Sequence, residues 1–324
     1  MRVVYFGTPQ FATPSLAALL ASRHIVVAVV TQPDRARGRG QHVTPSPVKA
    51  LAVAHGIPVL QPERLKDAEL LRTLAGFGAD IGVVAAYGKL LPQALLDLPP
   101  RGMVNVHASL LPRWRGAAPI HRAIQAGDTI TGVTIMRVVL ALDAGPMLAR
   151  VEVPIDDEIR SDELEARLAD AGTQLLVDTL DRLEAGTAAG TPQDETLVTY
   201  AARLDRRDSQ IDWTRPARAI HNQIRGLHPW PLAAVVWRGK RLILRASTLA
   251  PGTLAPGTST LTPGTLAPGT IVDVSAGILL VATGNSPLAV TEVQLEGRRA
   301  QSAREFINGA HPTAGDRFEP VSVS

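Results

Sequence analysis

Four short runs of apolar residues alternate with helical stretches in the first third of the chain, and this alternation constrains the fold most strongly. The runs cover residues 2–6, 24–30, 79–86 and 102–107. Strands that are apolar throughout are typical of a parallel sheet buried on both faces. Strands alternating with helices therefore predict an open α/β sheet, in which ligands bind beyond the carboxyl ends of the strands.

The last third of the chain consists of short β-rich runs separated by turn residues. Residues 232–247 predict two strands joined by an Arg-Gly-Lys turn, and residues 269–283 and 288–297 continue the pattern. Several such strands predict a small β-barrel or sandwich. A reiterated Pro-Gly-Thr unit at residues 248–270 prevents helix and central strand, so we interpret it as an expanded surface loop, with a binding role as the alternative.

A loop after the helical region at residues 161–185 separates these two patterns. A chain of 324 residues is long enough for two domains. We therefore predict an α/β domain at residues 1–188, a linker at 189–204, and a β-rich domain at 205–324 that contains the repeat.

Composition and spacing argue against several kinds of site. The chain has no cysteine, which excludes disulfides, thiolate zinc sites and cysteine nucleophiles. Its eight histidines are scattered, so we expect no catalytic metal. The first strand is followed only by Gly7, without the three-glycine dinucleotide fingerprint. With no secretory signal and no run of roughly 18 apolar residues, we expect a cytoplasmic protein without a membrane partner.

Asn105 and His107 form the first candidate site, at the end of the fourth apolar run. Residues two apart in a strand face the same side, so both side chains point one way near the ligand-binding edge. This spacing alone is equally compatible with two buried polar residues bonded to neighbouring loops. Asp143 favours a site, because it is the only acid between Asp128 and Glu152. An amide, an imidazole and a carboxylate can together serve acyl transfer.

The basic segment at residues 31–49 is the second candidate site. It carries Arg35, Arg37, Arg39 and Lys49 among glycines and prolines. A charged loop is usually only solvated, but loops longer than about 12–15 residues inside a compact domain are often functional. Arginines on such a loop suit phosphate contacts.

Residues 107–120, HASLLPRWRGAAPI, together with Asn105 and Asp143, resemble the formyltransferase family that uses 10-formyltetrahydrofolate. Residues 31–52 and 211–231 extend the resemblance over nearly the whole chain. The family implies a Rossmann-like formyltransferase domain with a mainly parallel sheet, followed by a smaller OB-fold-like β-barrel domain. It also implies transfer of a formyl group from N10 of the folate to the α-amino group of methionine on initiator tRNA.

The resemblance implies roles for single residues. Asn105, His107 and Asp143 match the family's catalytic triad. Its folate-binding turn corresponds to Ser109, Leu110, Leu111 and Pro112. The basic segment matches the part that contacts the tRNA acceptor stem, with Arg39 at the position of the key arginine and with Arg35, Arg37 and Lys49 around it. We expect Arg113, Trp114 and Arg115 to brace the turn, and the protein to act as a monomer.

The chain departs from the family pattern before Asp143, where residues 138–141 are Val-Val-Leu-Ala instead of including a polar residue and a glycine. We expect a more apolar loop with less backbone freedom.

Two other interpretations of the function compete with this one. A formyltransferase for a small amine, such as glycinamide ribonucleotide or an amino sugar, would keep the three catalytic residues without needing the basic segment. A non-catalytic RNA-binding protein would not need the triad intact.

Overall fold

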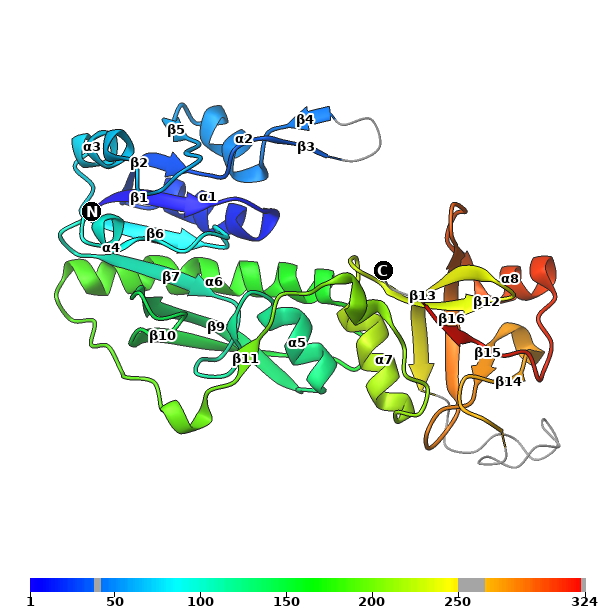
Figure 1. Cartoon of the computed structure of the whole chain (residues 1–324). Helices are drawn as coiled ribbons and strands as arrows, with labels where there is room; N and C mark the ends of the chain where they lie inside the picture. Colours follow the sequence, from blue (N-terminus) through cyan, green and yellow to red (C-terminus); the bar gives the residue numbers. More distant parts are fainter. Residues whose placement is uncertain (38–41, 250–265, 322–324) are drawn as a thin grey trace. The chain divides into compact units, whose positions relative to one another are not determined.

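The computed structural model describes residues 1–37, 42–249 and 266–321 (Figure 1). The chain divides into two compact units. Unit 1 consists of Met1–Pro119, Ile130–Pro154 and Glu165–Ala201, and unit 2 of Ile120–Thr129, Ile155–Leu164 and Ala202–Ser324. The chain therefore passes between the units more than once, and the domain limits at residues 188 and 204 stay a prediction. No described helix is both long and apolar enough to cross a membrane.

Unit 1 is built on a seven-stranded sheet, which confirms the predicted α/β fold. Its strands are β1 (Arg2–Gly7), β2 (Ile25–Val30), β5 (Val59–Leu60), β6 (Ile81–Ala85), β7 (Met103–His107), β9 (Ile130–Arg137) and β10 (Met147–Pro154). They lie in the order β10-β9-β7-β6-β1-β2-β5. The strands from β7 to β5 are parallel, whereas β9 pairs antiparallel with β7, and the edge strand β10 pairs antiparallel with β9. The four predicted apolar runs correspond to β1, β2, β6 and β7.

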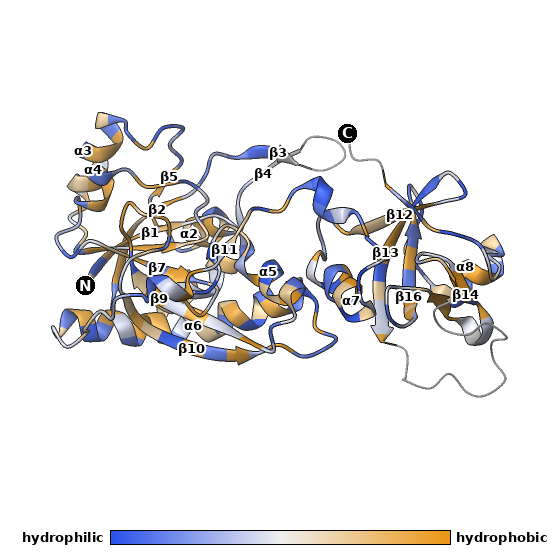
Figure 2. Cartoon of the chain, turned by 60° about the horizontal axis from the view of Figure 1, so that its bottom comes forward, coloured by the Kyte–Doolittle hydropathy of each residue, from blue (hydrophilic) through white to orange (hydrophobic). Residues whose placement is uncertain are grey.

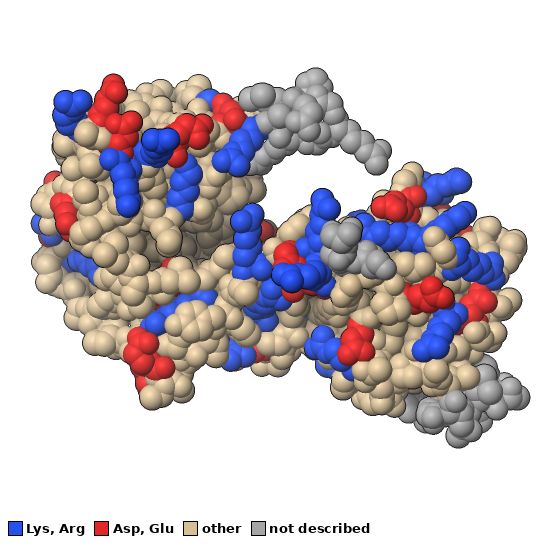
Figure 3. Space-filling model, in the orientation of Figure 1, with Lys and Arg blue, Asp and Glu red and all other residues tan. Residues whose placement is uncertain are grey.

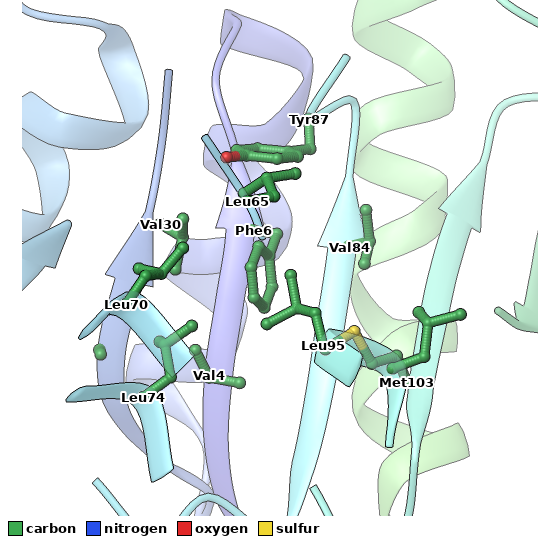
Figure 4. Packing of buried hydrophobic residues seen from close by; sticks show 12 residues of the cluster. Val4, Phe6, Val30, Leu65, Leu70, Leu74, Val84, Tyr87, Leu95 and Met103 are labelled. Carbon is green, nitrogen blue, oxygen red and sulfur yellow. The ribbon is translucent and has the colours of Figure 1, made fainter. Parts of the chain in front are cut away.

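Helices pack against both faces of this sheet. They are α1 (Thr13–Ala21), α2 (Pro47–Ala54), α3 (Ala68–Gly76), α4 (Gln93–Leu96) and α6 (Ser161–Glu184), with the 3-10 turn η1 (Gln10–Ala12). Leu74 of α3 and Leu95 of α4 join Phe6 in a buried cluster on one face, and α6 lies behind the strands in the same view (Figure 4). A Cβ at Gly172 of α6 would lie 3.2 Å from Val106 of β7, so helix and strand are in direct contact.

Two short pairings in unit 1 were not predicted. Inside the basic segment, β3 (Arg35–Arg37) and β4 (His42–Thr44) form an antiparallel hairpin. Next to the candidate site, β8 (Arg115–Gly116) pairs in parallel with β11 (Tyr200–Ala201), which comes from the predicted linker. The second pairing fastens that segment to unit 1.

Unit 2 carries an antiparallel sheet that curls into a half-barrel, as predicted for an OB-like domain. Its strands are β12 (Ala233–Trp237), β13 (Lys240–Leu249), β14 (Ile271–Asp273), β15 (Leu279–Val281), β16 (Leu288–Leu295), β17 (Gln301–Ser302) and β18 (Glu319–Pro320). Its helices and 3-10 turns are α5 (Pro119–Ala126, whose first residue belongs to unit 1), α7 (Ala217–Gly226), α8 (Ala303–Ala310), η3 (Arg206–Ser209) and η4 (Ser275–Gly277), and η2 (Glu195–Leu197) lies in unit 1.

The predicted hairpin in unit 2 is confirmed, because β12 and β13 pair directly. Arg238 and Gly239 between them both have positive φ, as tight hairpin turns require.

In Figure 2 the strands of unit 1 are coloured mostly as hydrophobic, whereas α6 and α7 mix both colours. Most of the Pro-Gly-Thr repeat, residues 250–265, lies outside the described residues, between β13 and β14.

Candidate active site

Asn105 and His107 lie on β7, and the alternation of that strand directs both away from the face that Val106 presents to α6. His107 is buried and Asn105 is half-buried. Within the described part of the chain, no hydrogen bond occupies the Asn105 side chain.

The imidazole of His107 is held by one ring nitrogen. Nε2 lies 2.9 Å from the main-chain oxygen of Trp114. A carbonyl oxygen only accepts hydrogen bonds, so Nε2 carries the hydrogen of this contact. In the neutral ring the lone pair then resides on Nδ1, and Nδ1 is the nitrogen left for proton transfer or for a substrate.

Asp143 reaches His107 from the loop between β9 and β10. Its Oδ2 lies 3.8 Å from Nδ1 of His107 and accepts a 2.8 Å hydrogen bond from the N–H of Gly116. The backbone of Asp143 has a φ of +46°, in the left-handed region that Asp and Asn tolerate better than most residues. The structure thus brings Asp143 to His107 across 36 positions of sequence, and Asn105 shares the face of β7 with them.

The residues before Asp143 form an exposed apolar stretch. Val139, Leu140 and Leu142 are 41%, 63% and 48% exposed. Grouped exposed apolar side chains commonly mark a binding surface. The residues that depart from the family pattern therefore form an exposed apolar surface next to Asp143 in the chain.

The turn at residues 109–112 is braced from within. The Ser109 hydroxyl is fully buried and donates to the main-chain oxygen of Arg113 at 2.6 Å. Thr134 of β9 donates to the Ser109 carbonyl at 2.7 Å and accepts the N–H of Leu111 at 3.1 Å. The Leu110 and Pro112 carbonyls also accept hydrogen bonds, from the N–H groups of Arg113 and Thr199. Because the Ser109 and Leu111 side chains are buried, the turn presents the half-buried Leu110 and Pro112 and only those main-chain groups that these bonds leave unpaired.

The side chains of the residues that follow the turn, Arg113 to Arg115, make contacts within the protein. The Arg113 guanidinium lies 4.5 Å above the Trp114 ring. Arg115 is buried and pairs with Glu195 at 2.8 Å, which holds the pKa of that carboxyl below its usual range. Such contacts are those expected of residues that brace the turn at residues 109–112.

Sequence reasoning missed Gln193, which lies in the predicted linker. Its Nε2 donates 2.8 Å hydrogen bonds to the main-chain oxygens of Asp143 and Gly145, and its Oε1 accepts from Nε of Arg115 at 2.9 Å. The contact with Arg115 spans 78 positions, and no local pattern marks it.

The basic segment is only partly described. Arg35 is exposed on β3, where Arg37 ends the strand, and Arg39 lies outside the described residues. Lys49 pairs with Asp34, and its Nζ also donates to Gln61 at 2.7 Å. Hydrogen bonds from Lys49 and from Gln61 to the Asp34 carboxylate lower the pKa of Asp34. Lys49 thus fastens the base of the hairpin.

One group of possible metal ligands occurs in the described residues, formed by His24, Asp181 and Glu184. Arg23 donates to Asp181 at 2.6 Å and pairs with Glu184 at 2.8 Å. The N-terminal ammonium of Met1 also pairs with Glu184 at 3.0 Å, so two cations already balance the two carboxylates. The group therefore suits an ion-pair network better than a metal ion.

Family models match both parts of the chain. The model described as "Formyl transferase" matches residues 1–180, and "Formyl transferase, C-terminal domain" matches residues 203–311. Among solved structures, a sugar 3N-formyl transferase, WlaRD, has a TM-score of 0.66 at 14% identity, covering 92% of this chain and 99% of its own. HypX from Aquifex aeolicus in complex with tetrahydrofolic acid has a TM-score of 0.60 at 15% identity, covering 100% of this chain and 51% of its own. These likenesses show the fold.

Curated relatives are much more similar in sequence. A methionyl-tRNA formyltransferase from Stutzerimonas stutzeri is 48% identical over 323 residues, which cover 100% of this chain and 98% of that protein. One from Pseudomonas fluorescens is 47% identical, covering 95% of this chain and 93% of that protein. One from Methylobacillus flagellatus is 46% identical, covering 98% and 99%. Their similarity spans both units and the candidate site, and the chain belongs to the methionyl-tRNA formyltransferase family.

Proposed function

We propose that this chain transfers the formyl group of 10-formyltetrahydrofolate to the α-amino group of methionine on initiator tRNA. The observation that carries the proposal is the approach of Asp143 to His107 on the face of β7 that also bears Asn105. Family membership supplies the reaction type, and the relatives' names supply the acceptor. We place the reaction in the cytoplasm, with the monomer as the active species.

The chemistry is an acyl transfer between two nitrogens. An α-amino group has a pKa of about 7.7–8.0, so a useful neutral fraction exists near pH 7. The amine nitrogen attacks the formyl carbon, a carbon–nitrogen bond forms, and the carbonyl oxygen gains negative charge. The bond from that carbon to N10 then breaks, and the amine loses one proton while N10 gains one. The reaction needs no covalent intermediate on the enzyme.

The three polar residues divide this work. The Asn105 amide donates to the developing oxyanion, which fixed donors stabilise strongly in a site with little water. His107 acts through Nδ1, because Nε2 is committed to Trp114. Asp143 balances charge on the imidazole, and the His107–Asp143 pair moves the amine proton to N10. The turn at residues 109–112 holds the folate through its main chain, Leu110 and Pro112.

Cations of both units serve the tRNA in this proposal. Arg35 and Arg37 of β3, together with Arg39 of the basic segment, contact phosphates of the acceptor stem, and Lys49 holds the hairpin base. On the face drawn in Figure 3, Lys and Arg side chains gather around β12 and β13 of unit 2. A groove of about 710 Å³ there includes Lys240, Arg241, Arg298 and Arg299 in its lining. A basic concave face of this kind suits an RNA backbone.

The test is formyl transfer from 10-formyltetrahydrofolate to purified methionyl initiator tRNA, measured as formylmethionine released after mild hydrolysis. We expect product with the charged tRNA, and none with uncharged tRNA. Glycinamide ribonucleotide and a 3-amino sugar nucleotide serve as competing acceptors. Transfer to either small amine, with none to the charged tRNA at saturating folate, would sink the proposal.

A further inference from the structure

The segment at residues 191–201, between the two sequence patterns, is fastened to the candidate active site at both ends. Thr191 and Met147 exchange two main-chain hydrogen bonds of 2.8 Å each. At the other end, Tyr200 and Ala201 pair in register with Arg115 and Gly116. The segment therefore extends from β10, the strand after the Asp143 loop, to β8, the strand that supplies the Gly116 amide.

Gln193 lies between these two attachments, and both its amide nitrogen and its amide oxygen form hydrogen bonds within the candidate active site. Its side chain is buried, and both hydrogen bonds from Nε2 go to carbonyls of the Asp143 loop, those of Asp143 and Gly145. The bond to the Gly145 carbonyl is buried and the bond to the Asp143 carbonyl is partly buried. A buried carbonyl without a donor is costly, so these bonds favour one conformation of the loop. That conformation is one in which Asp143 has a positive φ.

Arg115 fixes the orientation of Gln193. The Arg115 guanidinium donates from Nε to Oε1 of Gln193 at 2.9 Å, which leaves the Gln193 NH₂ group directed at the loop. Arg115 is 3% exposed and also pairs with Glu195 of the same segment. Its neighbour Gly116 donates to Oδ2 of Asp143. Gln193 thus contacts the main chain of Asp143, and Gly116, the neighbour of its partner Arg115, contacts the carboxylate.

We propose that Gln193 is a positioning residue for Asp143, and that the segment at residues 191–201 is a working part of the active site. Gln193 contacts the main chain of the loop, and it acts on the reaction only through the place it gives to the Asp143 carboxylate. Displacing a reacting group by about 1 Å can lower a rate about 10²-fold. The expected loss of kcat rests on the proposed function, whereas the role of Gln193 in holding the Asp143 loop does not.

The primary variant is Gln193→Met, which keeps the length and volume of the side chain and removes its two donors. We expect kcat for formyl transfer to fall about 10- to 100-fold, with KM for both substrates changed by less than about threefold. Gln193→Ala is the second variant, so that the test survives if either protein is unstable. Gln174→Ala, at an exposed glutamine of α6, is the matched control and should keep wild-type rates.

A double-mutant cycle separates positioning from a general structural role. If Gln193 acts through Asp143, adding Gln193→Met to Asp143→Asn lowers kcat less than about threefold further. If the two losses multiply instead, Gln193 does not act through Asp143 and the inference is wrong. Wild-type kcat in both Gln193 variants would overturn it equally.

Hydrogen exchange gives a readout that needs no substrate. The Gly116 amide donates to the Asp143 carboxylate, so its exchange rate reports the position of that group. We expect the Gly116 amide to exchange at least about tenfold faster in Gln193→Met, and at the wild-type rate in Gln174→Ala. Unchanged exchange would overturn the inference even if the wild-type enzyme forms no formylmethionyl-tRNA, so the two proposals fail separately.

Discussion

The main-chain N–H of Gly116 donates a 2.8 Å hydrogen bond to Oδ2 of Asp143, the same oxygen that faces Nδ1 of His107 at 3.8 Å. The carboxylate is therefore held by a hydrogen bond from the backbone. An amide oxygen at this position could accept the same N–H. Charge and geometry at residue 143 can thus be separated by experiment.

Asp143→Asn should keep the fold and lose the reaction. Asparagine tolerates the positive φ and preserves the Gly116 hydrogen bond, but it carries no charge to balance the imidazole. We expect kcat to fall at least about 10²-fold, with KM for the folate changed less than about threefold. Steady-state rates and thermal melting check this. A variant that melts as the wild type and keeps its rate would remove Asp143 from proton transfer.

His107→Ala should also lower kcat at least about 10²-fold. It additionally removes the donor to the Trp114 carbonyl, which should cost about 1–3 kcal/mol of unfolding free energy if no water replaces it. Urea unfolding measures the second effect independently of the first. The control is His55→Ala at an exposed histidine, which should leave both quantities unchanged. Near wild-type turnover in His107→Ala would exclude an acid–base or oxyanion role.

Arg39→Ala should raise KM for tRNA while leaving KM for the folate unchanged, because a phosphate contact contributes to binding the RNA alone. Loss of one such contact also lowers the slope of log affinity against log salt by about one. Rates over a range of tRNA concentrations at several salt concentrations give both quantities. Arg72→Ala, at an exposed arginine of α3, is the control. An unchanged salt slope would mean that Arg39 contacts no phosphate and that the basic segment is only solvated.

Tyr87→Phe should stabilise unit 1. The Tyr87 ring is buried edge-on against Phe6, and its hydroxyl has no hydrogen-bond partner among the described residues. Removing an unpaired buried hydroxyl should raise the unfolding free energy by about 1 kcal/mol. Tyr200→Phe, at a tyrosine that is 65% exposed, is the matched control and should have little effect on the unfolding free energy.

The same variant should change the alkaline limit of stability. Burial raises the pKa of Tyr87 from its ordinary value of 10.0 to about 12. The unfolded chain therefore loses this proton first, and stability falls as pH rises from 10 towards 12. Chemical unfolding between pH 8 and pH 11 should show a shallower loss in Tyr87→Phe. Parallel curves for variant and wild type would contradict the shifted titration.

The sequence predicted those parts of the fold that depend on local patterns. Continuous apolar runs located β1, β2, β6 and β7, and the Arg-Gly-Lys turn located the β12–β13 hairpin. The period of a strand was enough to place Asn105 and His107 on one face. Asp143 could be singled out because an isolated acid in an apolar segment is unusual.

What the sequence could not predict depends on contacts between distant residues. Residues 120–129 fall between two parts of unit 1 in the chain, yet they pack with unit 2. The Gln193–Arg115 contact joins positions with no shared periodicity or motif. The β3–β4 hairpin arose in a segment whose glycines and charges favoured a loop.

The β8–β11 pairing has a practical consequence for dissecting the protein. Cutting the chain at residue 188, where the change in sequence pattern suggests a boundary, would remove Gln193, Glu195 and the strand beside Arg115. A fragment made in that way would retain every residue of the predicted triad and still be poorly active, and its weakness would be misread as a need for the second unit. A fragment designed to measure the intrinsic activity of unit 1 must extend at least to Ala201.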